Sequence, residues 1–161
     1  MKEFFRMLEI VIALFVILWI LFTFIIGLKM VPNDDMSPRL NAGDIMLYYR
    51  IDKTTNSQDV IVVKKNNTEY VGRVIAKGGD TVEIKKEGNL IVNGNLVTES
   101  NIFYTTKPYE GFVKYPLKLK PDECFVLSDR RNSGEDSRYY GAVKKNEIVG
   151  TVIGLYRRAK F

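Results

Sequence analysis

The chain has 161 residues, a net charge of +5 and no histidine. The absence of histidine excludes Ser-His-Asp and Cys-His catalysis and the HExxH class of zinc enzymes. One cysteine cannot form an intrachain disulfide and leaves a zinc site short of ligands. Acidic and basic residues are interspersed, without the lysine- and arginine-rich runs of nucleic-acid-binding proteins. We therefore expect no nucleic-acid partner, no metal and no cofactor.

The N-terminal segment is apolar. From Ile10 to Ile26 no residue is charged, and only Thr23 is polar. With Leu28 the run is about 19 residues, or roughly 28 Å of helix, which matches the hydrocarbon core of a bilayer. It has no polar face, so the pattern predicts one transmembrane helix over 10–28 rather than a surface helix. A cleaved signal peptide would end in small residues of the A-x-A type, and none follow, so we expect the anchor to be retained.

The charges around this helix predict its orientation. Lys2 and Arg6 precede it, and the positive-inside rule places residues 1–9 in the cytoplasm, although Glu3 and Glu9 dilute the local charge. Residues 29–161 then form one extracytoplasmic domain of a cell-membrane protein, a length that suits one domain rather than two. Because this domain is mildly basic, the lipid bilayer is its first expected partner.

The remainder of the chain predicts a mainly β domain. Pro32 and Pro38 favour extended or turn backbone between Val31 and Leu40. Residues 99–118 are rich in tyrosine and predict a long loop with some strand. Glycine and asparagine turn signals separate short β-branched or alternating runs, typical of a compact barrel or sandwich. The predicted strands are Ile45–Tyr49, Asp59–Val63, Glu69–Ala76, Thr81–Lys85, Leu90–Val92, Asn95–Val97, Glu123–Leu127 and Ile148–Tyr156. Cys124 lies in one of them, where we expect a buried thiol rather than a nucleophile.

Four short segments resemble the sequence boxes of a known family. In chain order they are Asp35-Met36-Ser37-Pro38-Arg39-Leu40, Gly43-Asp44-Ile45-Met46-Leu47, Gly72 to Asp80, and Ser128 to Arg138. Behind a single anchor they resemble the bacterial type I signal peptidases, serine peptidase family S26. The boxes of that family read approximately S-M-x-P-T-L, G-D-x-V-x-V, K-R-V-I-G-x-P-G-D and G-D-N-R-x-x-S-x-D-S-R. The resemblance covers almost the whole chain and implies a signal-peptidase-like β domain outside the cytoplasm.

The resemblance also implies which residues would perform catalysis. The family uses a serine nucleophile and a lysine base, whose pKa must fall from about 10.4 through burial before it can take a proton. The nucleophile position holds Asp35, the base position holds Gly72, and the serine that orients the lysine maps onto Gly134. Glycine supplies no base or hydroxyl, and a carboxylate attacks an amide feebly. We therefore predict a catalytically inactive homologue, similar to the SpsA-type members of Gram-positive bacteria.

Other residues of the boxes keep their types. We expect an ion pair between Asp136 and Arg138 with a structural role, and turns at Gly43-Asp44 and Gly79-Asp80. Asp34, Asp35, Met36 and Pro38 would line a groove that binds exported precursors or signal peptides by strand addition. An active signal peptidase is a further expected partner. Arg39, Gly78 and Arg130 depart from the boxes at positions that shape the backbone of this groove.

Several alternatives stay open from the sequence. A relocated nucleophile, Ser37, could act with Lys77 in an active serine endopeptidase, although a strand would turn Lys77 away from the side of residue 72. The domain could instead be a purely structural extracytoplasmic module. Asp34 and Asp35 could form an acid pair or hold a cation, but adjacent residues diverge on an extended chain and the spacing is poor for Ca²⁺. Arg39 is the expected partner of either carboxylate.

Overall fold

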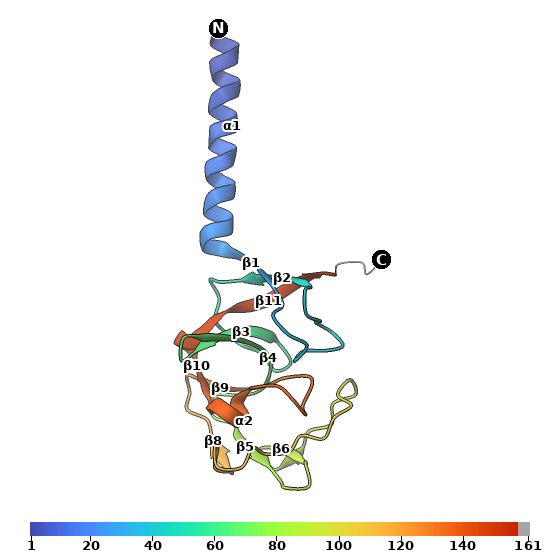
Figure 1. The fold of residues 1–161 in the computed structure, drawn as a ribbon. Coiled ribbons are helices and arrows are strands. Elements are labelled where there is room, and N and C mark those ends of the chain that lie inside the picture. The colour runs from blue at the N-terminus through green and yellow to red at the C-terminus, as the bar shows by residue number, and fades with distance from the viewer. Residues whose placement is uncertain (158–161) are drawn as a thin grey trace.

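The computed structural model describes residues 1–157, in which a long helix projects from a β domain (Figure 1). Helix α1 (Lys2–Ile20) continues as one π-helical segment (Leu21–Ile25) and has no buried residues. By length and composition, Lys2–Ile25 can cross a membrane. The helix begins at Lys2, before the predicted span of 10–28, and the helical prediction for residues 26–28 is wrong, because Ile26 already starts strand β1 (Ile26–Met30). The C-terminal end of the helix is set by the pairing of β1 with β2. This pairing is a long-range contact, so no local sequence pattern indicates where the helix ends.

The larger sheet has seven strands in the order β1-β2-β11-β3-β4-β9-β10. All its neighbouring strands pair antiparallel. Besides β1 its members are β2 (Ile45–Tyr49), β3 (Val60–Lys65), β4 (Thr68–Lys77), β9 (Glu123–Leu127), β10 (Val143–Lys144) and β11 (Ile148–Tyr156). Their inward side chains form buried clusters, one of which contains Val74, Val126 and Ile148.

A smaller sheet lies at the end of the domain farthest from the helix (Figure 1). Its four strands run in the order β7-β6-β5-β8. They are β5 (Thr81–Ile84), β6 (Leu90–Val92), β7 (Asn95–Leu96) and β8 (Leu117–Lys118). Another buried cluster, including Val82 and Phe125, joins the smaller sheet to the larger one. The mainly β fold behind one apolar helix is therefore confirmed.

Local patterns account for most strand positions. The β3–β4 hairpin turns on Asn66 and Asn67, both with positive φ, which asparagine tolerates in a two-residue turn. The short helices were missed: α2 (Ser137–Tyr140) and the 3-10 turn Lys145–Glu147 are too brief to show helical periodicity. Asp136 caps α2 by accepting a hydrogen bond from the backbone of Arg138.

The strands next to the anchor expose an apolar face. Met30, Ile45 and Tyr156 are direct cross-strand neighbours on β1, β2 and β11. They are 61%, 38% and 70% exposed, and Leu28 on the same face is 57% exposed. Because β1 follows the helix without a linker, this face begins where the anchor ends.

Candidate functional site

The positions of Asp35, Gly72 and Gly134 meet at the end of β9 and the residues that follow it. The backbone oxygen of Asp35 accepts a hydrogen bond from Arg130 N at 2.8 Å. A β-carbon at position 72 would lie 3.3 Å from the backbone oxygen of Leu127, the last residue of β9. A β-carbon at position 134 would lie 3.5 Å from Asp35 Cβ. The structure thus brings together the positions that the sequence boxes single out.

The space beside Gly72 is already filled. A β-carbon there would lie 2.5 Å from Val126 Cγ1, far inside the contact distance of about 3.5–4.0 Å for two carbons. Val126 is fully buried, and a β-branched side chain has few rotamers to escape into. Position 72 therefore accepts a lysine only if residue 126 becomes smaller or moves.

The space beside Gly134 is filled as well, by a residue that the sequence did not single out. A β-carbon at 134 would lie 2.1 Å from Ser128 Oγ and 2.4 Å from Ser128 Cβ. Ser128 Oγ donates to Asp136 Oδ2 at 2.9 Å, and Ser128 N donates to the same oxygen at 3.1 Å. One sequence feature could have indicated this residue: Ser128 stands where the family box has glycine.

The Asp35 carboxylate is half-buried in an acidic surrounding. Asn33 Nδ2 donates to Asp35 Oδ2 at 2.7 Å. Burial raises the pKa of Asp35, the Asn33 hydrogen bond opposes that shift, repulsion by Asp136 and Glu135 adds to it, and Arg130 opposes it. The pKa of Asp35 lies above its ordinary value as a result. No neighbour activates this carboxylate as a nucleophile among the contacts of residues 1–157.

Asp34 and Met36 support the backbone around this position. Asp34 Oδ1 accepts from Ala42 N at 2.8 Å and does not contact the Asp35 carboxylate within the described chain. Met36 is buried, and its sulfur accepts from Asp129 N at 3.4 Å. The expected pairing of Arg39 with Asp34 or Asp35 is wrong. Among residues 1–157 the Asp35 carboxylate bonds Asn33 instead, and Asp34 caps the turn that leads to Ala42.

Two of the expected turns hold aspartates in matching roles. Gly43 and Gly79 have φ of +87° and +91°, which favours glycine. Each is followed by an aspartate that closes the turn: Asp44 accepts from Asn41 N at 3.0 Å, and Asp80 from Lys77 N at 2.9 Å. Pro38 is exposed, and its carbonyl accepts from Asn41 Nδ2 at 3.4 Å.

Buried ion pairs hold the segment after β9. The expected Asp136–Arg138 pair is confirmed, with Arg138 Nε and Nη2 donating to the two carboxylate oxygens at 2.9 and 2.7 Å. Arg73, next to Gly72, makes a second bidentate pair with Asp129 at 2.7 and 2.5 Å. All four side chains are nearly inaccessible to solvent. Such pairs fix geometry more than they add stability, because each charge loses its hydration.

The tyrosine-rich loop docks on this framework. Arg131 Nη1 and Nη2 donate to Thr106 and Glu99, each at 2.6 Å. Tyr109 donates its hydroxyl to Gly134 O at 2.8 Å, and its ring centroid lies 4.4 Å from the Arg138 guanidinium carbon. The contacts join segments 25 or more residues apart, so no local pattern revealed them.

Ser37 and Lys77 are not assembled into a dyad. Lys77 pairs with Cys124 at the start of β9, whereas Arg73 pairs with Leu127 at its end. That separation of three residues corresponds to about 10 Å along a strand. Ser37 is half-buried in the turn after Asp34, to whose carbonyl its N–H donates at 3.0 Å.

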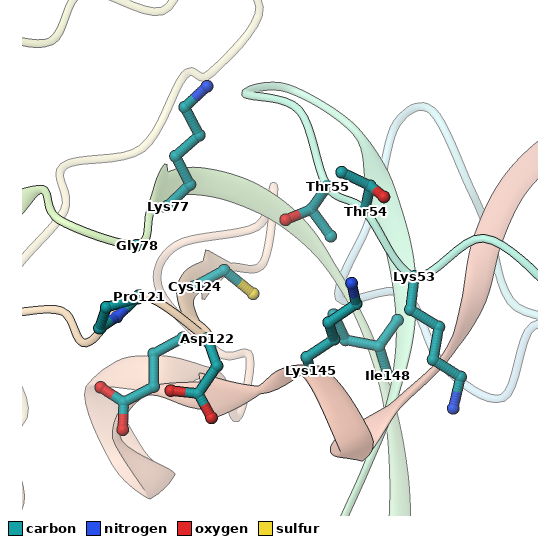
Figure 2. A pocket seen from close by; sticks show the side chains of 11 residues that line it. Lys53, Thr54, Thr55, Lys77, Gly78, Pro121, Asp122, Cys124, Lys145 and Ile148 are labelled. Atoms are coloured by element: carbon teal, nitrogen blue, oxygen red, sulfur yellow. The ribbon is translucent and has the colours of Figure 1, made fainter.

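Lys77 instead borders a cavity of about 210 Å³, with Cys124 and Lys145 among its lining residues. Figure 2 shows the Cys124 thiol and Lys145 pointing into this cavity while Lys77 extends away. Cys124 is 3% exposed, so the expected buried strand thiol is confirmed. Burial raises the pKa of this thiol to about 12. Across residues 1–157, no histidine, cysteine or carboxylate cluster is arranged to hold a metal ion.

Comparison with known proteins shows which family and which solved structure this chain is similar to. The family model described as signal peptidase, peptidase S26, matches residues 4–156. The chain is 30% identical over 155 residues to the inactive signal peptidase IA of Staphylococcus aureus (strain COL), covering 91% of this chain and 87% of that protein. It is 28% identical to the signal peptidase I of Leptolyngbya laminosa, covering 81% and 68%. A crystal structure of a signal peptidase I from Enterococcus faecalis V583 has the same fold, with a TM-score of 0.52 and 24% identity over 62% of this chain and 97% of the other.

Proposed function

The chain belongs to the signal peptidase family S26, and we propose that it is a membrane-anchored member that binds extended peptides without cleaving them. The observation that carries the absence of cleavage is the loss of the nucleophile and of the space for a base. Val126 occupies the space of a side chain at 72, and a carboxylate replaces the nucleophile at Asp35. In a comparable nucleophile–base system, removing one partner costs about 10⁶-fold in rate. That the S. aureus relatives are named inactive supports the same conclusion.

Peptide binding is supported by the strand that leads to Gly72. On one edge β4 pairs with β3 along Thr68–Arg73, while on the other edge β9 pairs only with Arg73–Lys77. Within residues 1–157, Thr68–Gly72 therefore has a strand neighbour on one side alone. Backbone groups on such an edge can add an extended peptide as a further strand. This edge ends at Gly72, next to the end of β9.

The proposed arrangement relative to the membrane is supported by the charges before the anchor and by the apolar face beside it. Met30, Ile45 and Tyr156 continue the apolar surface of the helix onto the domain. Burying their exposed area in the headgroup region would be favourable by about 25 cal/mol per Å². We place residues 1–9 in the cytoplasm and the β domain outside, resting on the outer leaflet through this face.

Cleavage is the decisive assay for inactivity. The full chain in liposomes would be incubated with a precursor whose signal peptide ends in an A-x-A site, and products would be separated by mass. We expect no product from the parent chain or from Asp35→Ser. We expect product from D35S/G72K/V126A, in which Val126→Ala makes room for the lysine. The matched control, D35A/G72K/V126A, lacks a nucleophile and reveals any contaminating peptidase. Cleavage by the parent above this control would refute the proposal.

Binding separates a peptide-binding protein from a purely structural module. A fluorescent signal peptide would be titrated with the parent chain and its anisotropy measured. The control peptide has the same composition with prolines at alternate positions, which removes backbone donors and prevents strand addition. We expect only the first peptide to bind. If neither binds, the domain is a structural module.

Topology is tested on intact cells. In a Cys124→Ala background, a single cysteine would be placed either at Lys2 or at Lys86, which is exposed in the β domain. A membrane-impermeant maleimide should label only the cysteine at 86. Labelling only at position 2 would reverse the proposed orientation.

A further inference from the structure

Ser128 and Gly134 face the same small volume from two limbs of one loop. Ser128 follows β9 directly and is 1% exposed. Its Oγ and Cβ lie 2.1 and 2.4 Å from the point where a β-carbon of residue 134 would stand. Two side chains cannot share that volume, so a serine at 128 requires a glycine at 134.

The family box has these two residue types in the opposite order. It reads G-D-N-R-x-x-S, with glycine first and serine seventh, whereas this chain has Ser128 first and Gly134 seventh. In a position-by-position sequence comparison, the serine at the seventh position of the box is absent, because residue 134 is glycine. In space, a hydroxyl is present where the side chain of residue 134 would lie.

The hydrogen bonds of Ser128 leave it able to accept. Its one hydroxyl proton is donated to Asp136 Oδ2 at 2.9 Å, with the carbonyl of Arg130 a poorer acceptor at 3.3 Å. Asp136 is held in turn by Arg138. With the proton directed to a carboxylate, the oxygen lone pairs are free to receive an N–H. The same volume lies beside Asp35, whose Cβ is 3.5 Å from the hypothetical β-carbon at 134.

We propose that Ser128 supplies, from the opposite limb of the loop, the hydroxyl that position 134 supplies in signal peptidases. The third position of the site is therefore exchanged rather than lost, and only the nucleophile and the base are missing. Ser128 is a positioning residue: in a chain given a lysine at 72, its oxygen would accept an N–H of the neutral amine and turn the nitrogen lone pair toward residue 35. This positioning role rests on the proposed function, while the spatial exchange stands by itself.

The spatial exchange is tested by stability alone. Thermal unfolding of the full chain in detergent micelles would compare Ser128→Gly, Gly134→Ser and S128G/G134S with the parent. Gly134→Ser should lower the Tm by about 4 °C or more through its clash with Ser128. Ser128→Gly should lower it through loss of the hydrogen bond from Ser128 Oγ to Asp136. The double variant should return to within about 2 °C of the parent. Additive losses in the double variant would overturn the exchange.

The positioning role is tested in the reactivated D35S/G72K/V126A chain. Adding Ser128→Ala should lower the cleavage rate by about 10²-fold and shift the pH at which activity appears, because the lysine loses its hydrogen-bond partner. Adding S128G/G134S instead should keep both the rate and the pH profile, since the hydroxyl returns from the other limb. If Ser128→Ala matches its parent in rate and pH profile, the role is refuted. If the D35S/G72K/V126A chain does not cleave, the intact groove of the proposed function fails, while the stability comparison still decides the exchange.

Discussion

Alanine at position 72 should destabilise the domain, whereas an alanine in a strand is ordinarily better than a glycine. The added β-carbon would lie 2.5 Å from Val126 Cγ1. Overpacking of this kind costs about 1–3 kcal/mol, while relief of glycine entropy in a strand returns about 0.5–1 kcal/mol. We expect Gly72→Ala to lower the free energy of unfolding by about 1–2 kcal/mol, the difference between these terms.

The effect should reverse sign when Val126 is shortened. Val126→Ala removes two buried carbons at about 0.8 kcal/mol each, plus a cavity term, for a loss of about 2–3 kcal/mol. In that background the methyl group of Gly72→Ala enters the vacated space, and we expect a gain of about 1 kcal/mol. The coupling between the two substitutions is then about 2–3 kcal/mol.

Urea unfolding of the full chain in detergent micelles measures each term. Near-ultraviolet circular dichroism of the tyrosines is the suitable signal, because the single tryptophan, Trp19, lies in α1 and not in the β domain. Gly154→Ala is the matched control: its β-carbon would lie 3.6 Å from Leu47 Cβ, an ordinary contact, so it should be neutral or slightly stabilising. An equal effect of Gly72→Ala in both backgrounds would refute the packing argument.

Three further outcomes follow from the buried charges and the thiol. Asp129→Ala leaves Arg73 buried and unpaired and should cost about 3–5 kcal/mol in the same urea assay, whereas R73M/D129L should restore most of the loss. Because the pKa of Asp35 is raised on folding, its ionisation destabilises the folded state. Asp35→Asn should therefore be more stable than the parent at pH 7, with the difference vanishing below its ordinary pKa of 3.8. Cys124, with a pKa raised to about 12, should react with iodoacetamide at pH 8 only after unfolding in urea.

Sequence reasoning found the strands whose signals are local. Strands β2, β6, β9 and β11 have the predicted bounds, because alternation and flanking turn residues mark both ends. It failed at β1, where an apolar run is compatible with either helix or strand. Pairing of Met30 with Ile45 and of Ile26 with Tyr49 decides the matter, and such contacts are not written into a local pattern.

For the site, the sequence boxes identified positions 35, 72 and 134. They did not indicate which side chains occupy the space beside Gly72 and Gly134. Val126 and Gly72 lie on different strands, so their contact depends on the register of β4 against β9. That register contains a shift between Val74 and Ala76 that no sequence pattern indicates. The sequence contains both Ser128 and Gly134 in the order opposite to that of the family box. Only the structure shows that a side chain at residue 134 would occupy the same volume as the side chain of Ser128.

The buried charges around the site fix its backbone geometry, on which the proposed peptide-binding role depends. Three arginines of the site, Arg73, Arg131 and Arg138, are each 5% exposed or less. Their hydrogen bonds hold residues 128–138 and the tyrosine-rich loop of residues 99–118 in place. Apolar residues of similar volume would stabilise a domain at least as well, because buried ions lose their hydration. What these pairs provide is a defined backbone path beside the open edge of β4. In the proposed function, this path positions the backbone next to the strand edge Thr68–Gly72, to which the peptide would add.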